Sequence, residues 1–115
     1  MKLSSVKFTI GVGKDKDGSS ITEIAAPAIA MVCIAIADAF GGYTKTKGFG
    51  GWVDSNKKLV EEPVVIIEAA VTNGLRYETT GDIRQEAQRI VDLAKDLLKQ
   101  ECILVQYIAG NSGLA

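Results

Sequence analysis

The sequence contains no histidine, the residue that most often serves enzymes as a general base and as a metal ligand. Without histidine, the Ser-His-Asp and Cys-His arrangements of nucleophilic catalysis are excluded. The sequence also lacks a Cys-x-x-Cys pair, so the usual zinc-site spacings are missing. We therefore expect no catalytic residue of these kinds, no metal and no cofactor.

The chain also lacks an excess of charge of either sign, and it has only two cysteines. The chain has 13 basic and 14 acidic residues and a net charge of −1, so it offers no broad basic field for a nucleic acid polymer. Cys33 and Cys102 each lie in an apolar stretch without an adjacent cation that would lower the thiol pKa. Both are expected to be buried free thiols rather than a disulfide.

Long apolar runs are limited to one. No basic segment precedes an apolar run at the N-terminus, so a signal peptide is not visible. The run from Ile24 to Ala37 carries no charge but is shorter than the ~20 residues that a membrane span needs. The 115 residues are expected to form one domain of a soluble, cytoplasmic protein with no membrane partner.

The order of apolar segments predicts the fold. Val6 to Val12 alternates with period two, as in a half-buried strand, and an apolar helix is expected within 20–40. Two strands, 43–53 and 59–71, flank a polar turn, and a helix capped by Asp82 precedes a strand from Cys102 to Ile108. This βαββαβ order predicts an α+β, ferredoxin-like sandwich, with two helices on one face of a four-stranded antiparallel sheet.

The first helix carries unusual features. Ser20 and Glu23 fit a capping box, Pro27 either starts or kinks the helix, and Gly41-Gly42 ends it. Its apolar residues surround the axis instead of forming one stripe, so it is expected to be buried on more than one side. We therefore predict self-association into a homodimer or a higher even oligomer, through this helix or the open sheet face.

Glycines cluster in the first strand of the hairpin, at Gly48, Gly50 and Gly51. Because they lie within a hairpin, they do not fit a phosphate-binding loop, which joins a strand to a helix. They favour either a bulged or strongly twisted strand or the close approach of a ligand. The neighbouring Trp52 is either a core or interface anchor or a platform on which a flat ligand stacks.

Acidic residues of the second hairpin strand do not pair. Glu61 and Glu62 are consecutive, so their side chains point to opposite faces. Glu62 and Glu68 share a face but lie roughly 20 Å apart. Catalysis by paired carboxylates is therefore not expected, and Glu68 is expected to need a cationic partner. Pro63, which follows Glu62, indicates a sheet edge or a bulge.

Cations and aromatic rings in loops and on the first hairpin strand suggest a binding site for a small anionic, nucleotide-like ligand at a subunit interface. Cations would pair with phosphates, and rings would stack on bases. The alternative is a set of solvated surface residues. The candidate ligand-binding residues are Lys45, Lys47, Trp52, Arg76, Tyr77 and Arg84.

Because no known catalytic arrangement is present, a non-enzymatic binding protein is favoured over an enzyme. Two alternatives stay open. One is a protein–protein interaction or structural oligomer without a small ligand. The other is a small ferredoxin-like enzyme without histidine or metal, which could use a tyrosine or lysine as its base.

The stretch from 41 to 107 resembles small proteins encoded by phages and prophages, mostly uncharacterised. The shared pattern is a glycine–threonine strand, Gly-Trp, a polar turn, glutamates before an apolar strand and Gln-Glu before the last strand. The matching residues are Gly41, Gly42, Thr44, Gly48, Gly51, Trp52, Glu61, Glu62, Gln100 and Glu101. The resemblance implies a phage-type binding protein, similar in kind to the Thoeris and CBASS anti-defence sponges that sequester cyclic nucleotide signals.

Overall fold

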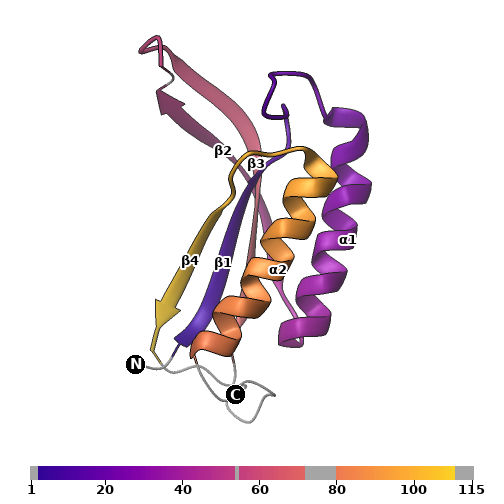
Figure 1. The fold of residues 1–115 in the computed structure, drawn as a ribbon, viewed down its shortest axis with the longest axis vertical. Coiled ribbons are helices and arrows are strands. Elements are labelled where there is room, and N and C mark those ends of the chain that lie inside the picture. The colour runs from indigo at the N-terminus through magenta and orange to yellow at the C-terminus, as the bar shows by residue number, and fades with distance from the viewer. Residues whose placement is uncertain (1–2, 54, 72–79, 111–115) are drawn as a thin grey trace.

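Six elements follow one another in the predicted order in a computed structural model, which describes residues 3–53, 55–71 and 80–110. They are β1 (Leu3–Gly11), α1 (Thr22–Phe40), β2 (Thr44–Val53), β3 (Leu59–Ala70), α2 (Thr80–Leu98) and β4 (Leu104–Ala109). Figure 1 shows α1 and α2 side by side in front of the sheet.

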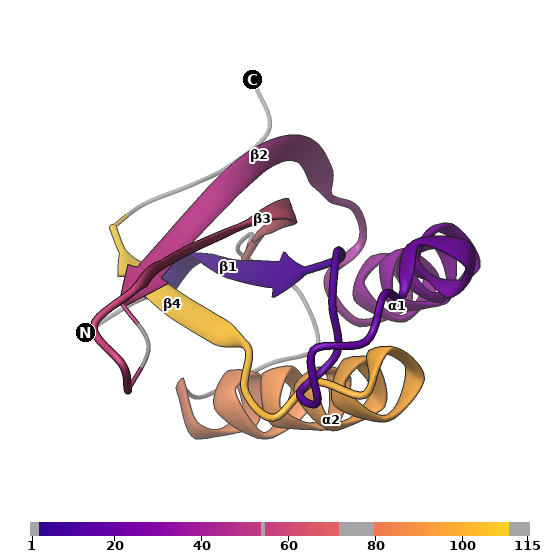
Figure 2. The same cartoon turned by 90° about the horizontal axis from the view of Figure 1, so that it is seen from above.

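The four strands form one sheet in the order β2-β3-β1-β4, and every neighbouring pair is antiparallel. Figure 2, the view from above, shows both helices on the same side of a strongly curved sheet. The predicted α+β, ferredoxin-like sandwich is confirmed. One sheet face therefore packs on the helices, and the other, which we call the open face, is not covered by any described element.

The core lies between the sheet and the helices. Val6, Phe8 and Ile10 of β1 are almost fully buried, and they alternate with less buried neighbours. Ile67 and Ala69 of β3 extend the same apolar surface, which packs against buried residues of both helices. No polar or charged residue is buried within the described part of the chain. The period-two patterns read from the sequence thus identify the helix-covered face.

Helix α1 differs from its prediction at the start. Its N-cap is Ile21, without a side-chain cap bond, and Ser20 instead contacts the Thr22 hydroxyl at 2.9 Å, so the capping box is wrong. Burial of the Ile21 side chain, which is 3% exposed, accounts for this choice of cap. Pro27 lies inside the helix, and Gly41 forms the predicted left-handed end, with φ of 93°.

The all-round apolar character of α1 also has a structural consequence. By length and composition, α1 is the one helix among the described residues that could cross a membrane. Its inner side, however, supplies Ile29, Val32 and Ile36 to the core. It therefore serves as a core helix of the domain. Its outer side leaves Met31 and Ile34 exposed, at 51% and 70%.

Three smaller predictions are corrected. Cys33 is buried as expected, but Cys102 is exposed, because it precedes β4 rather than packing within it; both thiols are free. Helix α2 begins at Thr80, so Asp82 lies within its first turn rather than before it. The register of β2 with β3 is continuous from Thr44 to Val53, so the glycines produce no bulge.

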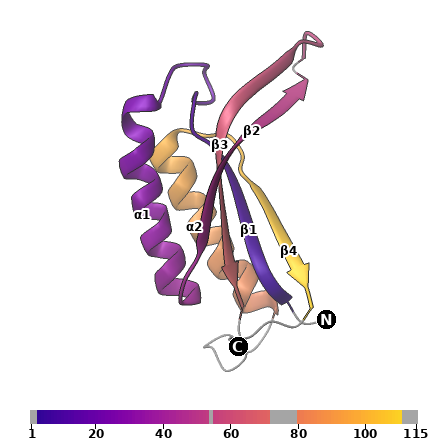
Figure 3. The ribbon, with the colours of Figure 1, turned by 180° about the vertical axis from the view of Figure 1, so that it is seen from behind.

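The β2–β3 hairpin extends beyond the helices as a two-stranded arm (Figure 3). β1 stops pairing with β3 at Gly11 and Val64, and the next residue, Pro63, lacks an N–H for further pairing. Pro63 therefore marks the point where β3 becomes an edge strand, as predicted. Beyond it, the arm exposes apolar side chains, with Phe49 80%, Val53 64% and Leu59 67% exposed.

Candidate functional site

The open face has a defined composition because residues paired across antiparallel strands point to the same side. Val64, Ile66 and Glu68 of β3 alternate with the core residues Val65, Ile67 and Ala69, so they lie on the open face. Their cross-strand partners complete this face. The partners are Ser5, Lys7, Thr9 and Gly11 of β1, Thr44, Thr46, Gly48, Gly50 and Trp52 of β2, and Leu104, Gln106 and Ile108 of β4.

Glycines gather around Val64 and Glu62 on the open face. Val64 pairs with Gly48 on one side and with Gly11 on the other, and Glu62 pairs with Gly50. We call Gly11, Gly48 and Gly50 the glycine patch. Since these three residues have no side chains, other groups can lie directly on their backbone, as the Glu62 carboxylate does at Gly11.

The Glu62 side chain is half-buried against this patch. A Cβ atom at Gly11 would lie 2.0 Å from Oε1 of Glu62, so the carboxylate occupies the space that any other residue would fill. Burial raises the pKa of Glu62 above its usual value, although a backbone hydrogen bond from Lys14 and the charge of Lys14 act in the opposite direction. A partly desolvated carboxylate of this kind is typical of binding and catalytic sites.

Gln100 holds the loop against which Glu62 packs. Its side-chain amide donates to the carbonyl oxygens of Gly11 at 3.1 Å and Lys14 at 2.7 Å. The Val12 N–H donates to the Pro63 carbonyl at 3.0 Å on the other side of the same segment. The backbone that contacts Glu62 is thus fixed by β3 on one side and by the segment between α2 and β4 on the other.

Replacing Gly11 by alanine is expected to displace Glu62 without unfolding the domain. The new methyl group would meet the flexible end of a glutamate side chain, which can rotate away. We expect the pKa of Glu62 to fall toward its ordinary value because the displaced carboxylate gains water. Carbon-detected NMR titration of the glutamate carboxyl groups measures this. An unchanged Glu62 pKa would show that Gly11 does not set its environment.

A second polar group lies farther along the open face. Ser5 donates a hydrogen bond to Oε2 of Glu68 at 3.1 Å, and Lys7 pairs across the strands with Glu68. Thr44 and Gln106 continue this row on the outer strands. The cation Lys7 is thus adjacent to Glu68 in register, whereas the hydrogen bond that Glu68 accepts comes from Ser5.

Three of the predicted ligand residues lie on β2 but on different faces. Lys45 and Lys47 pair with Ile67 and Val65, so they belong to the helix side of the sheet, beyond the reach of the helices, and both are exposed. Trp52 pairs with Val60 and belongs to the open face, where it is 47% exposed. The lysines and the tryptophan therefore do not face one common ligand within one chain.

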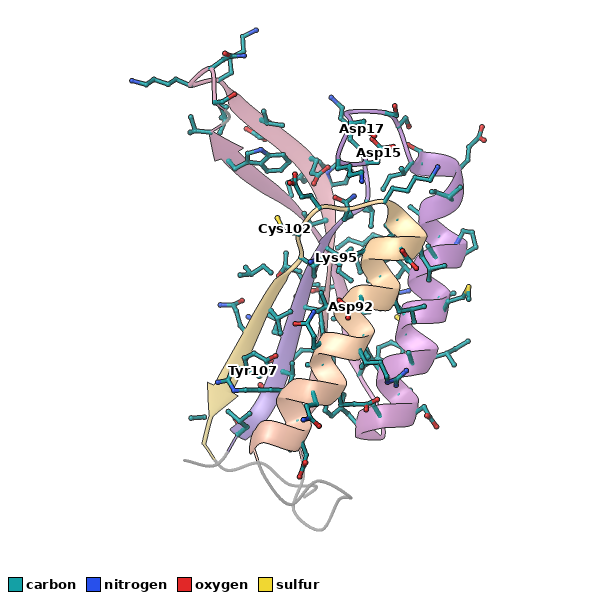
Figure 4. The ribbon with its side chains drawn as sticks, in the orientation of Figure 1. Asp15, Asp17, Asp92, Lys95, Cys102 and Tyr107 are labelled. Carbon is teal, nitrogen blue, oxygen red and sulfur yellow. The ribbon has the colours of Figure 1, made fainter. Side chains whose placement is uncertain are left out.

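Arg84 is engaged elsewhere. Its guanidinium carbon lies 4.1 Å from the ring centroid of Tyr107, a cation–π contact between α2 and β4. Figure 4 shows Tyr107 at one end of β4 and Cys102 beyond the other end. Tyr107 pairs with Val6, five residues before Gly11, roughly 17 Å along β1 from the glycine patch. Arg76 and Tyr77 lie outside the described residues, so the anion site stays a prediction.

Sequence reasoning missed Glu62, Gly11 and the side-chain role of Gln100. Glu62 was weighed only as a partner for another carboxylate, whereas its actual neighbours are glycine backbone atoms from a distant segment. The available signal was Gly11-x-Gly13 directly after a strand, together with a Gln-Glu pair before the last strand. Within the described ranges, no cluster of three or more histidine, cysteine or acidic residues could hold a metal ion.

No protein-family model matches the sequence, and no curated protein matches it. Among solved structures, the fold is similar to that of a phage SAM lyase (SAM, S-adenosylmethionine) in complex with S-methyl-5′-thioadenosine. The TM-score is 0.63 at 22% identity, over 88% of this chain and 76% of that chain. A phage SAM lyase in its apo state gives a TM-score of 0.59 at 21% identity, over 90% and 78% of the two chains.

A Bacillus cereus protein related to NIF3 is also similar, with a TM-score of 0.52 and 12% identity. The match covers 94% of this chain but only 26% of that one. At these identities, the likenesses establish a shared fold. The two lyase structures come from phage, in agreement with the predicted phage-type resemblance, but these similarities show no anti-defence sponge family.

These similarities correct the functional prediction. The sequence alone leaves enzyme activity open but favours a non-enzymatic sponge for a nucleotide-like anion over an enzyme. This preference is contradicted, because the similar phage structures are those of a lyase. The small ferredoxin-like enzyme without histidine, kept as the second alternative, fits better.

Proposed function

We propose that this protein is an enzyme that cleaves S-adenosylmethionine and releases S-methyl-5′-thioadenosine, with its site at the Glu62 end of the open face. The observation that supports this site is the half-buried Glu62 carboxylate on the glycine patch. The reaction is suggested by the fold shared with a phage SAM lyase over 88% of the chain.

The charge of the substrate suits a carboxylate better than a cluster of cations. S-Adenosylmethionine carries a sulfonium and an α-ammonium group, both positive, and one carboxylate. Because the ammonium keeps its charge throughout the reaction, we assign Glu62 to bind it. The predicted cation cluster suits a phosphate ligand instead, and it does not assemble among the described residues.

The apolar part of the open face suits the bond-breaking step. Cleaving the bond between the sulfonium sulfur and Cγ of the methionine moiety returns both bonding electrons to sulfur and cancels its positive charge. An environment of low polarity destabilises the charged sulfonium more than the transition state, in which that charge is already dispersed. Val64, which is 7% exposed, is the next residue on this face after Glu62, and the half-buried Ile66 follows it, roughly 13 Å from Glu62.

Two routes release the same thioether. The substrate carboxylate can attack Cγ and close a lactone, which needs no protein base. Alternatively, a base can remove a proton from Cβ, so that the four-carbon fragment leaves as an alkene; Glu62 would then be that base. Both routes balance without water, a metal or an oxidant, and neither needs a histidine, which this chain lacks.

A second copy of the chain is proposed to complete the site. The open face exposes Leu104 at 58% and Ile108 at 36%, more large apolar surface than a sheet facing water usually carries. Pairing of copies through this face would bury these residues and exclude water from Glu62. The predicted homodimer or higher even oligomer thus stays our expectation for the assembly.

The proposal is tested by incubating the purified protein with S-adenosylmethionine and following both products by mass spectrometry. We expect S-methyl-5′-thioadenosine to appear together with an equal amount of a four-carbon amino acid derivative. A lactone identifies internal closure, and an alkene identifies elimination. Recovery of intact S-adenosylmethionine under conditions in which the protein is folded would contradict the proposal.

A further inference from the structure

Trp52 has a position on the open face that fits a flat aromatic ligand. It lies in the cross-strand row next to that of Glu62, because Trp52 pairs with Val60 and Gly50 pairs with Glu62. Diagonal neighbours of this kind are about 7 Å apart, within reach of an aromatic side chain. About half of the indole surface is accessible, at 47% exposure.

Gly48 lies on the same face of β2, four residues and roughly 13 Å from Trp52, and gives an independent reason to expect an external group on this stretch of the open face. A Cβ atom at Gly48 would lie 3.8 Å from Cγ2 of Val64, an ordinary contact, so the packing of the chain itself does not require glycine there. Gly50 differs, because its Cβ would lie only 3.0 Å from Val64. An unforced glycine within a strand costs stability and often marks a site where a ligand approaches the backbone.

We propose that Trp52 and Gly48 form a subsite for the adenine ring of the substrate, with the purine stacked on the indole and lying along the backbone of the glycine patch. This inference rests on the proposed function, since it assigns the adenosine part of the ligand that Glu62 would hold at its amino acid end. The ligand class is an uncharged purine nucleoside group, bound through stacking rather than through phosphate contacts.

The tryptophan itself reports on this contact, because Trp52 is the single tryptophan of the chain. Titration with S-methyl-5′-thioadenosine is expected to quench its fluorescence in a saturable way, with the same dissociation constant that calorimetry gives. Replacing Trp52 by leucine should weaken binding about 5- to 100-fold, whereas tyrosine, which keeps an aromatic face, should retain most of the affinity.

Matched substitutions separate the subsite from the fold. Gly48→Ala should leave the domain folded yet weaken binding, because the added methyl group lies between ligand and backbone. Phe49→Leu, on the opposite face of the same strand, should change neither binding nor fluorescence quenching. Three results would each overturn the subsite. They are tryptophan fluorescence that saturating ligand does not quench, a Trp52→Leu affinity within twofold of wild type, and no binding of S-methyl-5′-thioadenosine at all.

The two proposals fail in different ways. Quenching by S-methyl-5′-thioadenosine without cleavage of S-adenosylmethionine would keep the adenine subsite and refute the lyase activity. Cleavage with an unaffected tryptophan would keep the activity and refute the subsite. The tryptophan emission could instead be blue-shifted and unchanged by ligand, and the Trp52→Leu variant could lose its oligomer. Together these results would show that Trp52 is an interface anchor, and they would also overturn the subsite.

Discussion

The Glu62→Gln variant is expected to lose most of its activity toward S-adenosylmethionine while keeping its fold. Glutamine has nearly the same shape but no charge, so the ionic hydrogen bond to the substrate ammonium is lost. Such bonds contribute about 1.5–3 kcal/mol, which corresponds to a fall in kcat/KM of about 10- to 150-fold. If Glu62 binds the ammonium equally in ground and transition states, the loss appears mainly in KM.

The same variant distinguishes the two chemical routes. If Glu62 acts as a base at Cβ, its replacement by glutamine should lower kcat rather than raise KM. Its pKa, raised by burial, makes it a stronger base than an ordinary glutamate. Steady-state kinetics with product identification therefore assigns the role of the side chain.

Two glutamates of the same strand serve as controls. Glu61 is exposed and lies on the opposite face of β3, and Glu68 lies on the open face but roughly 20 Å from Glu62. Glu61→Gln and Glu68→Gln should retain most of the activity. A kcat/KM of the Glu62→Gln variant within threefold of wild type would remove Glu62 from the site.

Replacing Leu104 by lysine is expected to convert the oligomer to monomers. In a single chain Leu104 is 58% exposed, so the lysine should cost the isolated domain little. In an assembly that covers the open face, however, every copy would bury an unpaired charge at about 2–5 kcal/mol. The association constant should then fall more than about 100-fold, and sedimentation velocity measures the change.

A lysine at Ile34 on the outer side of α1 is the matched comparison. Ile34 is even more exposed, at 70%. The apolar outer side of α1 is the second surface through which the sequence predicts self-association. Dissociation by Ile34→Lys alone would move the interface to α1. A wild-type protein that sediments as a monomer at high concentration would contradict self-association, and an odd number of subunits would contradict the predicted even one.

The fold could be predicted because it depends on local periodicity. The alternation of Val6, Phe8 and Ile10 and the helical spacing of α2 each identify one buried face, and the βαββαβ order then leaves few ways to pair the strands. Features that depend on competition between local and distant interactions were predicted less well. Ile21, for example, is the N-cap of α1 because its side chain is buried in the core.

The site was harder to predict because it depends on contacts that are remote in sequence. Gly11 and Glu62 are brought together by the β1–β3 pairing, and Gln100 reaches their loop from the segment between α2 and β4. None of these residues forms a local motif. Trp52 and Gly48, in contrast, are close in sequence, and both were singled out as candidates for a ligand before their common face was known.

A crystal structure of the protein with S-methyl-5′-thioadenosine tests the location of the site most directly. The account predicts the ligand on the open face, with its adenine on Trp52 and its thioether end directed toward Glu62. A ligand bound elsewhere would contradict it, for example in the shallow cavity between Asp15, Glu23 and Lys99 at the start of α1.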